Sequence, residues 1–187
     1  MDSQDTTSAW AMITRSRRPD ELDACIALMA DVHAADSYPL RWPDDPRAWL
    51  TPNGLLVAWV AEHEHRLIGH VALRSATGAS AASAAVWSGA TGLPPDQIAV
   101  IARLLVAPDA RGHGVGAALL DKAWAEARSR RLWPVLDVID HSRSAIALYE
   151  RKGWRRVASV PAMWAQTSSG QPLLHYYIAP GSPDALS

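Results

Sequence analysis

Arg111-Gly112-His113-Gly114-Val115-Gly116 lies between an apolar run at 101–106 and a stretch with helical periodicity. Glycines allow a backbone to approach an anion closely, because they have no Cβ atom. The first amide groups of a helix have no carbonyl partners within that helix, and the helix dipole favours negative charge there. The order of buried strand, glycine turn and helix therefore predicts a phosphate site at 111–116.

The residues around this turn make the prediction more specific, because glycine spacing alone is common in ordinary turns. A P-loop is excluded, since no lysine follows the glycines before Lys122. A dinucleotide fingerprint is excluded as well, because the spacing is Gly-x-Gly-x-Gly and lies late in the chain. One apolar helical face follows the turn, made of Val115, Leu119, Leu120, Ala123, Trp124 and Ala127.

The turn resembles the acetyl-coenzyme A (acetyl-CoA) signature of the GCN5-related N-acetyltransferases (GNAT). That signature has Arg or Gln, two residues, Gly, one residue, and Gly or Ala, and here these positions are Arg111, Gly114 and Gly116. The residues at 103–110 resemble the family's fourth strand and the loop after it, and those at 136–138 and 145–154 resemble its fifth strand and the following helix. The resemblance covers about 98–160 directly and the rest more loosely.

The resemblance implies a single-domain α/β fold. Its sheet would be mixed and mostly antiparallel, flanked by helices, with fourth and fifth strands that splay apart. The alternation of periodic segments agrees with this fold. We expect a domain at 11–179 between tails at 1–10 and 180–187, with strands near 11–17, 55–62, 67–75, 101–106, 133–139, 155–160 and 173–179, and helices near 19–35, 115–130 and 142–152.

Composition limits the class of protein. The 187 residues are 49% hydrophobic, enough for one core. The net charge of −1 argues against a nucleic-acid surface. The longest apolar run, 55–61, is too short to cross a bilayer, and the polar first residues do not resemble a secretory signal. We therefore expect a cytoplasmic protein that binds neither nucleic acid nor membrane. Its one cysteine, Cys25, is expected in the core.

Residues 76–96 are rich in Ala, Ser and Gly. The family usually joins its third and fourth strands more tightly, so we expect an insertion here. A long loop inside a compact domain is either functional or mobile. The insertion is therefore predicted to be a disordered excursion or a lid over the acceptor cleft.

By resemblance, the coenzyme lies along the fourth strand and the glycine turn. The pantetheine arm would pair with backbone groups of Leu104, Leu105 and Val106, one of which would polarise the thioester carbonyl. Ser142 stands where the family often has an Asn that bonds the same arm.

The diphosphate would bind backbone amides of the turn, and Arg111 would add positive potential. The His113 side chain is expected to face solvent, so this residue would contribute its backbone only. The coenzyme-binding residues predicted here are Arg111, Gly112, His113, Gly114, Val115, Gly116 and Ala117.

Tyr149 is the predicted general acid. By resemblance, a Tyr at this point of a Leu-Tyr-Glu motif lies close to the coenzyme sulfur. A phenol with a pKa near 10 suits protonation of a departing thiolate. The alternative is a core tyrosine on the same helical face as Ile146.

The general base is less well determined. Many relatives carry a Glu on the fourth strand at the position of Val100, and that carboxylate is missing here. Asp137 matches a fifth-strand Glu that serves as base in the ribosomal-protein branch of the family, so we predict Asp137, with Asp96 and Glu62 as further candidates. The alternative role for Asp137 is a hydrogen-bond acceptor that orients its neighbours.

Together these observations predict an acetyl-CoA-dependent N-acetyltransferase that acts on a primary amine of a small molecule or of a protein. The amine would attack directly in a ternary complex, because Cys25 lies on the wrong element for an acetyl-cysteine route. Two alternatives stay open: the same fold with a different acyl donor, and a coenzyme-binding sensor without catalysis. The loop at 37–52 is expected to line the acceptor site, and many relatives form dimers, which leaves a homodimer open.

No metal is assigned. His63 and His65 form a His-x-His pair, but no third ligand lies close in sequence and the charged neighbours are typical of an exposed turn.

Overall fold

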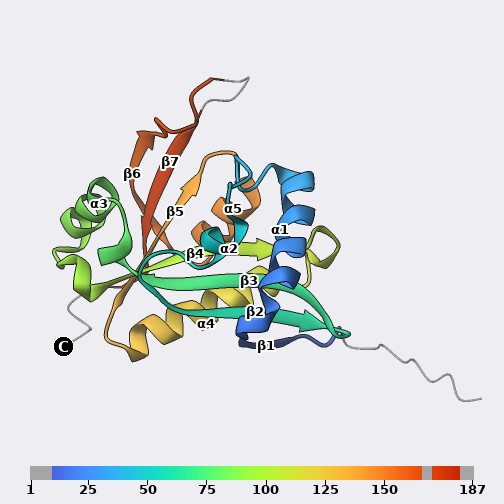
Figure 1. The fold of residues 1–187 in the computed structure, drawn as a ribbon. Coiled ribbons are helices and arrows are strands. Elements are labelled where there is room, and N and C mark those ends of the chain that lie inside the picture. The colour runs from blue at the N-terminus through green and yellow to red at the C-terminus, as the bar shows by residue number, and fades with distance from the viewer. Residues whose placement is uncertain (1–9, 166–169, 182–187) are drawn as a thin grey trace, which may run out of the picture.

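The computed structural model describes residues 10–165 and 170–181, which form one α/β domain. Seven strands make a single mixed sheet in the order β1-β2-β3-β4-β5-β7-β6 (Figure 1). The predicted fold class is confirmed. The strands are β1 Ile13–Ser16, β2 Leu55–His63, β3 Arg66–Ser75, β4 Ile98–Val106, β5 Trp133–Ile139, β6 Arg155–Pro161 and β7 Leu173–Ile178, and the helices are α1 Leu22–Asp36, α2 Pro46–Leu50, α3 Ala81–Thr91, α4 Val115–Ser129 and α5 Arg143–Arg151.

The pairing of β4 with β5 differs from every other pairing in the sheet. These two strands run parallel, whereas the other neighbours are antiparallel. Their register includes Ile98 with Trp133, Ala99 with Pro134 and Val100 with Val135, and it ends there. Beyond these pairs the strands separate, so the predicted splay between the fourth and fifth strands is confirmed.

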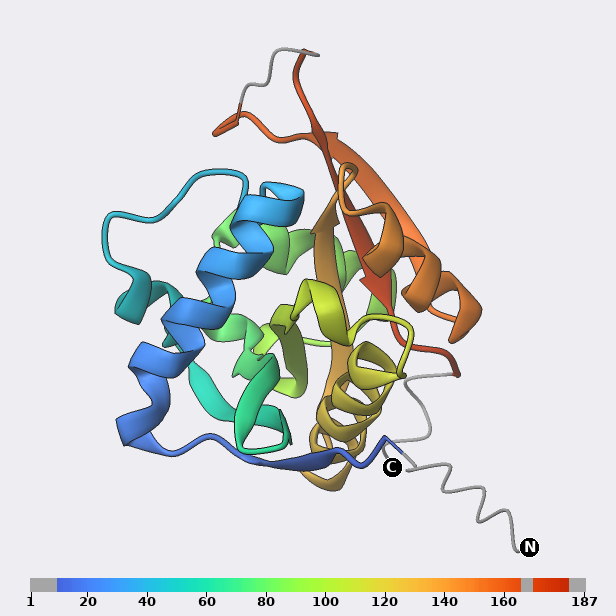
Figure 2. The ribbon, with the colours of Figure 1, turned by 90° about the vertical axis from the view of Figure 1, so that its right-hand side faces the viewer.

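Helices cover both faces of the sheet. Figure 2 shows α1 on one side of the sheet and α4 and α5 on the other. The α1 face that packs on the sheet is apolar at helical spacing and includes Cys25, which is fully buried as predicted. On α4 the predicted apolar face is buried except for Trp124, which is 37% exposed.

The prediction of a loop without regular structure at 76–96 is wrong, because most of this segment is helix α3. Ser80 caps the helix by accepting a hydrogen bond from the Ser83 amide at 3.1 Å, and Gly92 ends it with a φ of +73°. The Trp87 side chain is fully buried and packs edge-on against Tyr176 of β7 at a ring distance of 5.5 Å. A helix of small residues is thus attached to the sheet by one large side chain.

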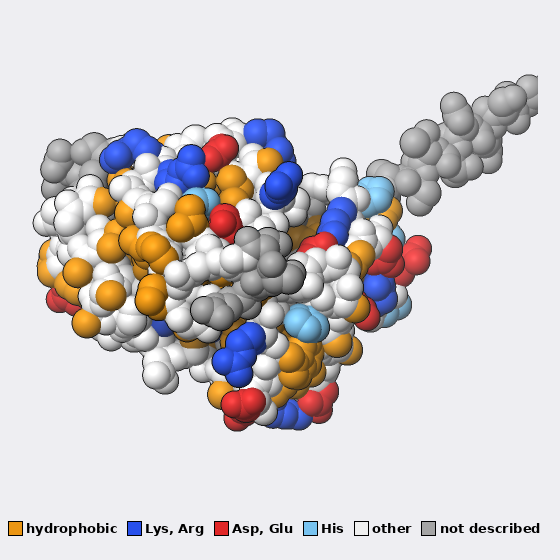
Figure 3. All heavy atoms as spheres, turned by 90° about the horizontal axis from the view of Figure 1, so that it is seen from above, with side chains coloured by type: hydrophobic (Ala, Val, Ile, Leu, Met, Phe, Trp, Pro, Cys, Tyr) orange, Lys and Arg blue, Asp and Glu red, His pale blue; other side chains and the backbone are white. Residues whose placement is uncertain are grey.

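The surface carries side chains of mixed character, and the helices are short. In the view of Figure 3, basic, acidic and hydrophobic side chains are intermixed on one face of the molecule. Among the residues that the structure describes, the helices are too short or too polar to cross a bilayer.

Candidate functional site

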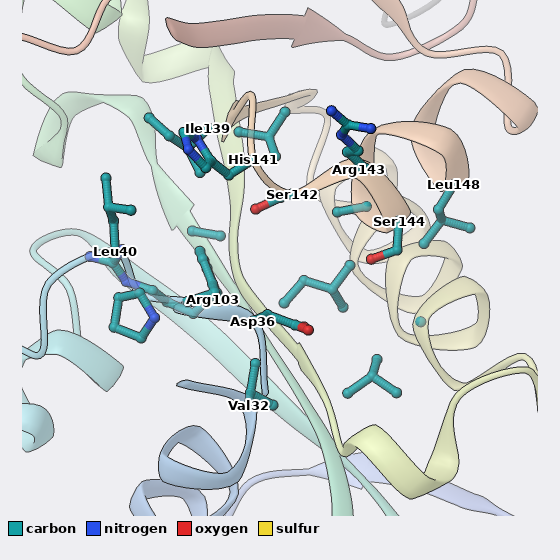
Figure 4. Close-up of a pocket in the computed structure, with 18 of the residues that line it drawn as sticks. Val32, Asp36, Leu40, Arg103, Ile139, His141, Ser142, Arg143, Ser144 and Leu148 are labelled. Carbon is teal, nitrogen blue, oxygen red and sulfur yellow. The ribbon is translucent and has the colours of Figure 1, made fainter. Parts of the chain in front are cut away.

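A cavity of about 1100 Å³ opens where β4 and β5 separate. Its walls come from α1 and the loop after it, from β4 and β5, from the glycine turn and from α5 (Figure 4). Eleven of the thirteen predicted site residues line it. These are Leu104, Val106, Arg111, Gly112, Gly114, Val115, Gly116, Ala117, Asp137, Ser142 and Tyr149.

The glycine turn forms one end of the cavity. Gly112 and Gly114 have φ angles of +81° and +80°, a conformation that residues with a Cβ atom rarely adopt. Gly114 is the N-cap residue of α4. Since Gly114 has no side chain to cap the helix, the amides of the first turn remain for a ligand. A Cβ atom on Gly116 would lie 3.3 Å from Cδ2 of Leu148 and 3.5 Å from Cγ2 of Val106. This end is therefore a narrow backbone surface suited to an anion.

Two predicted coenzyme residues do not line the cavity. Leu105 is buried and pairs with His70 of β3, so its side chain belongs to the core. The His113 side chain is exposed, but it does not simply face solvent: its ring stacks on Trp10 at 4.2 Å. Trp10 also stacks on His63 at 4.4 Å, which joins the N-terminal segment to the glycine turn.

Arg111 is paired within the protein. Its guanidinium donates two hydrogen bonds to the Asp36 carboxylate, at 3.0 and 2.5 Å. Asp36 ends α1, and Figure 4 shows its carboxylate directed into the cavity from the side opposite α5. Sequence reasoning missed Asp36, because it lies 75 residues from Arg111 and is an ordinary acidic residue at a helix end.

Ser142 is the N-cap residue of α5, and Figure 4 shows its hydroxyl and that of Ser144 facing the cavity. Beyond Val100 the β4 edge that faces β5 is not part of the strand register. Leu104 and Val106 of this stretch line the cavity. An extended ligand in this space could therefore reach the hydroxyl groups of Ser142 and Ser144 as well as the edge of β4.

Tyr149 and Asp137 line this gap from different elements. Tyr149 of α5 is 5% exposed, and burial raises the pKa of its phenol. Asp137 of β5 is half-buried; burial raises the pKa of its carboxyl group, and the nearby Arg74 and Arg103 oppose that rise. No hydrogen bond or ion pair ties the Asp137 carboxylate to another described residue. It is therefore able to accept a proton from a ligand.

The other candidate bases lie elsewhere. Asp96 is exposed on the short helical turn before β4, outside the cavity lining. Glu62 accepts hydrogen bonds from Arg15, at 3.2 and 2.7 Å, and is also outside the lining. Val100 is buried in the core. Geometry thus favours Asp137 among the predicted carboxylates.

The other end of the cavity is made of side chains. Tyr38, Trp42 and Asp44 of the loop after α1 line it, as the sequence predicted for this loop. Asp45 instead caps α2, by accepting a hydrogen bond from the Ala48 amide at 3.0 Å. Trp49 of α2 completes this wall.

Arg103 stands at the centre of this end and was missed by sequence reasoning. It sits at an irregularity in the β3–β4 register and has a φ of +57°. Its Nε donates to the Trp49 carbonyl at 3.0 Å, and its guanidinium carbon lies 4.0 Å from the centre of the Trp49 ring.

A buried histidine holds the backbone of Arg103 in place. Arg17 donates to Nε2 of His70 at 2.9 Å and to the Leu50 carbonyl at 2.9 Å. Since an arginine cannot accept, His70 carries its proton on Nδ1 and donates it to the Arg103 carbonyl at 2.9 Å. Burial lowers the pKa of His70 to about 4, so this neutral form is the stable one.

Within 10–165 and 170–181, no three side chains of His, Cys, Asp or Glu gather as a metal site would require. Nδ1 of His63 donates a hydrogen bond to the Ala11 carbonyl, 2.6 Å away, and the His63 ring stacks on Trp10.

The sequence and the fold both match known proteins. The sequence model of the Acetyltransferase (GNAT) family matches residues 18–154. The structure of the ribosomal-protein-S18-alanine N-acetyltransferase from Escherichia coli superposes with a TM-score of 0.68 at 18% identity, covering 92% of this chain and 95% of that one. No curated protein matches the chain in sequence.

Structures of NAA60 from Arabidopsis thaliana are similar as well. The complex with a bisubstrate analogue has a TM-score of 0.67 at 22% identity and covers 92% of this chain and all of that one, 100%. The complex with acetyl-CoA has a TM-score of 0.65 at 20% identity, covering 90% and 97%. At these identities the likeness concerns the fold.

Proposed function

The chain belongs to the acetyltransferase (GNAT) family, and from that premise we propose that it is an acetyl-CoA-dependent N-acetyltransferase. The acceptor is a primary amine, which attacks the acetyl group directly in a ternary complex. One observation carries the proposal: a single cavity has the glycine turn at one end and contains both Asp137 and Tyr149.

The donor end fits the coenzyme. The first amides of α4 and the Arg111 guanidinium would hold the diphosphate, in a turn where a Cβ on Gly116 would lie only 3.3 Å from the Leu148 side chain. The backbone of Leu104, Leu105 and Val106 would pair with the pantetheine arm, and Ser142 would bond it. The NAA60 complex with acetyl-CoA supports a coenzyme of this kind for the fold.

Two side chains would move the protons. When bound, acetyl-CoA supplies the acetyl group as a thioester. Asp137 takes a proton from the acceptor nitrogen, since an ammonium has no lone pair with which to attack; its raised pKa makes it a stronger base than an exposed aspartate. Tyr149 gives a proton to the departing sulfur, and its raised pKa keeps the phenol protonated until then.

The test is thiol release from acetyl-CoA with a panel of amines, alongside coenzyme binding by calorimetry. We expect turnover by the wild type, and Tyr149→Phe to lower kcat about a hundredfold or more while the Kd for the coenzyme stays near its wild-type value. Tyr177→Phe is the matched control: this hydroxyl donates to Glu150 at 3.0 Å and lies outside the cavity lining.

Each other outcome points to a different function. Coenzyme binding without turnover across the panel would favour a sensor, and faster release from a bulkier thioester would favour a different acyl donor. A wild-type rate in Tyr149→Phe would remove this residue from the mechanism. A cytoplasmic location, a homodimer and the absence of nucleic-acid, membrane and metal binding stay predictions.

A further inference from the structure

We infer that Arg103 binds an oxyanion on the acceptor, so that the preferred substrate is a small zwitterionic amine of the amino-acid type. This inference rests on the proposed function and names the acceptor class of the same cavity. The anionic group is a carboxylate or a phosphonate, since both offer two oxygens to a planar guanidinium.

The Arg103 guanidinium is fixed before any ligand arrives. Its Nε is engaged with the Trp49 carbonyl, its flat face lies 4.0 Å over the Trp49 ring, and its backbone carbonyl is held by His70. Few rotations remain for the side chain, so its terminal N–H groups keep one direction. Arg103 lines the cavity, and Figure 4 shows it on the β4 wall below Ser142.

A second donor stands beside these N–H groups. Tyr38 also lines the cavity and packs edge-on against the same Trp49 ring, at a distance of 5.9 Å between ring centres. Burial raises the pKa of the Tyr38 phenol, and the charge of Arg103 opposes that rise. The Tyr38 ring and the Arg103 guanidinium therefore both lie against Trp49 on one wall of the cavity. A ligand oxyanion placed there would receive hydrogen bonds from both.

The balance of charge favours a zwitterion over a simple amine. Arg103 is close enough to Asp137 to affect the pKa of that carboxyl group. Arg74 and Arg103 already place two positive charges near Asp137, so an acceptor with only an ammonium group would add a third, and the guanidinium groups would repel it. An acceptor that also carries an oxyanion neutralises Arg103, and leaves Asp137 for its own ammonium group.

The test uses matched sets of acceptors: an amino acid, its primary amide, the decarboxylated amine, the corresponding aminophosphonate and a short peptide. For phenylalanine these are phenylalanine, phenylalaninamide, phenethylamine, 1-amino-2-phenylethylphosphonate and a phenylalanine-initiated tripeptide. We expect kcat/KM for the amino acid or the aminophosphonate to exceed that for the amide by about tenfold to a hundredfold, the range of a charged hydrogen-bonded pair. The two anionic arms decide which oxyanion is preferred.

Arg103→Gln then tests the residue. The preference for the anionic acceptors should fall to less than about threefold, through KM, while KM for phenethylamine stays the same or falls. Arg131→Gln is the matched control, because Arg131 is exposed, lies outside the cavity lining and has a similar φ of +58°. Calorimetry with CoA checks that the Arg103 variant folds.

Three results would overturn the inference. These are equal or better turnover of the amide, the amine or the peptide by the wild type, an unchanged preference in Arg103→Gln, and loss of the preference in Arg131→Gln. If Arg103→Gln does not bind CoA, the wild-type comparison alone decides. Absence of thiol release with every amine, despite CoA binding, would instead contradict the proposed N-acetyltransferase activity.

Discussion

At the glycine turn the cavity wall is main chain, whereas around Arg103 it is side chain. Gly112, Gly114 and Gly116 present backbone to the cavity, and a Cβ on Gly116 would be in tight contact with the Leu148 side chain, 3.3 Å away. At the other end, Tyr38, Trp49 and Arg103 form the surface. The donor end should therefore be sensitive to added atoms, and the acceptor end to changed functional groups.

Asp137→Asn should have the largest effect, because it removes the proposed base at the acceptor end without changing shape. We expect kcat to fall about 10²–10⁴-fold, the usual contribution of a positioned base, while the coenzyme Kd is unchanged. Asp96→Asn, which alters an exposed carboxylate outside the cavity lining, should keep the wild-type rate.

The pH dependence of kcat provides a second measure of the same residue. Burial raises the pKa of Asp137, so the rate should fall with decreasing pH at values above those at which an exposed aspartate becomes protonated. This acid limb should disappear in Asp137→Asn. If kcat of Asp137→Asn stays within about threefold of the wild-type value, water and not Asp137 accepts the proton.

Gly116→Val tests the donor end by adding side-chain volume without changing its charge. Gly116 lines the cavity and a Cβ there would already lie 3.3 Å from the Leu148 side chain, so we expect a valine side chain to take up space at this end of the cavity. We expect the Kd for CoA to rise about a hundredfold, close to 3 kcal/mol. Calorimetry gives the Kd, and Gly89→Val is the control, since a Cβ on this α3 glycine meets nothing within 4 Å. Unchanged CoA binding would place the coenzyme away from the turn.

His70 supports the acceptor end and predicts a dependence of stability on pH. Its pKa is lowered from 6.5 to about 4 by burial, so below pH 6.5 the unfolded chain binds a proton that the folded chain does not. Folding stability contributed by neutral His70 is thus complete above pH 6.5 and decreases as the pH falls towards 4. Between pH 7 and pH 5 we expect a loss of about 2 kcal/mol.

Urea unfolding at the two pH values measures this loss. His70→Asn keeps a donor for the Arg103 carbonyl but has no side chain that titrates in this range. The free energy of unfolding of this variant should therefore lack the pH-dependent loss expected for the wild type. His141→Asn, at an exposed histidine, is the control. An equal pH dependence in wild type and His70→Asn would show that His70 is not responsible.

The two ends also differ in how far the sequence predicts them. The geometry of the glycine turn was predictable, because a backbone surface suited to an anion requires glycines at fixed positions before an apolar helix, and both are visible in 111–127. Arg103 was not, because its direction depends on a strand irregularity and on His70, which lies 33 residues away. Asp36 opposite Arg111 was missed for the same reason.

The error at 76–96 has another cause. Alanine favours helices, and Ser80 and Gly92 are ordinary start and stop signals, so the local sequence contains the signals of α3 although 76–96 was predicted to be an insertion without regular structure. The segment was interpreted by its length as an insertion instead. The packing of α3 depends on the contact of Trp87 with Tyr176 and on the hydrogen bond between the hydroxyl groups of Ser83 and Tyr176, at 3.1 Å. Ser83 and Tyr176 are 93 residues apart in the sequence, so this contact is not visible in the local sequence.

Asp36→Asn should have the smallest effect, and it tests whether the donor end is pure main chain. The Asp36 carboxylate occupies the Arg111 guanidinium and faces a site proposed to hold a diphosphate, so it competes with the ligand for the same donor. Its removal should tighten CoA binding about three- to fivefold, since exposed pairs contribute at most about 1 kcal/mol, and the gain should shrink in salt.

Asp121→Asn is the control: it removes the same charge from an exposed pair with Lys152 outside the cavity lining. Calorimetry at two salt concentrations decides between two roles. Tighter binding means that Asp36 competes with the diphosphate, whereas weaker binding means that Asp36 positions Arg111, so that the donor end also depends on side-chain geometry.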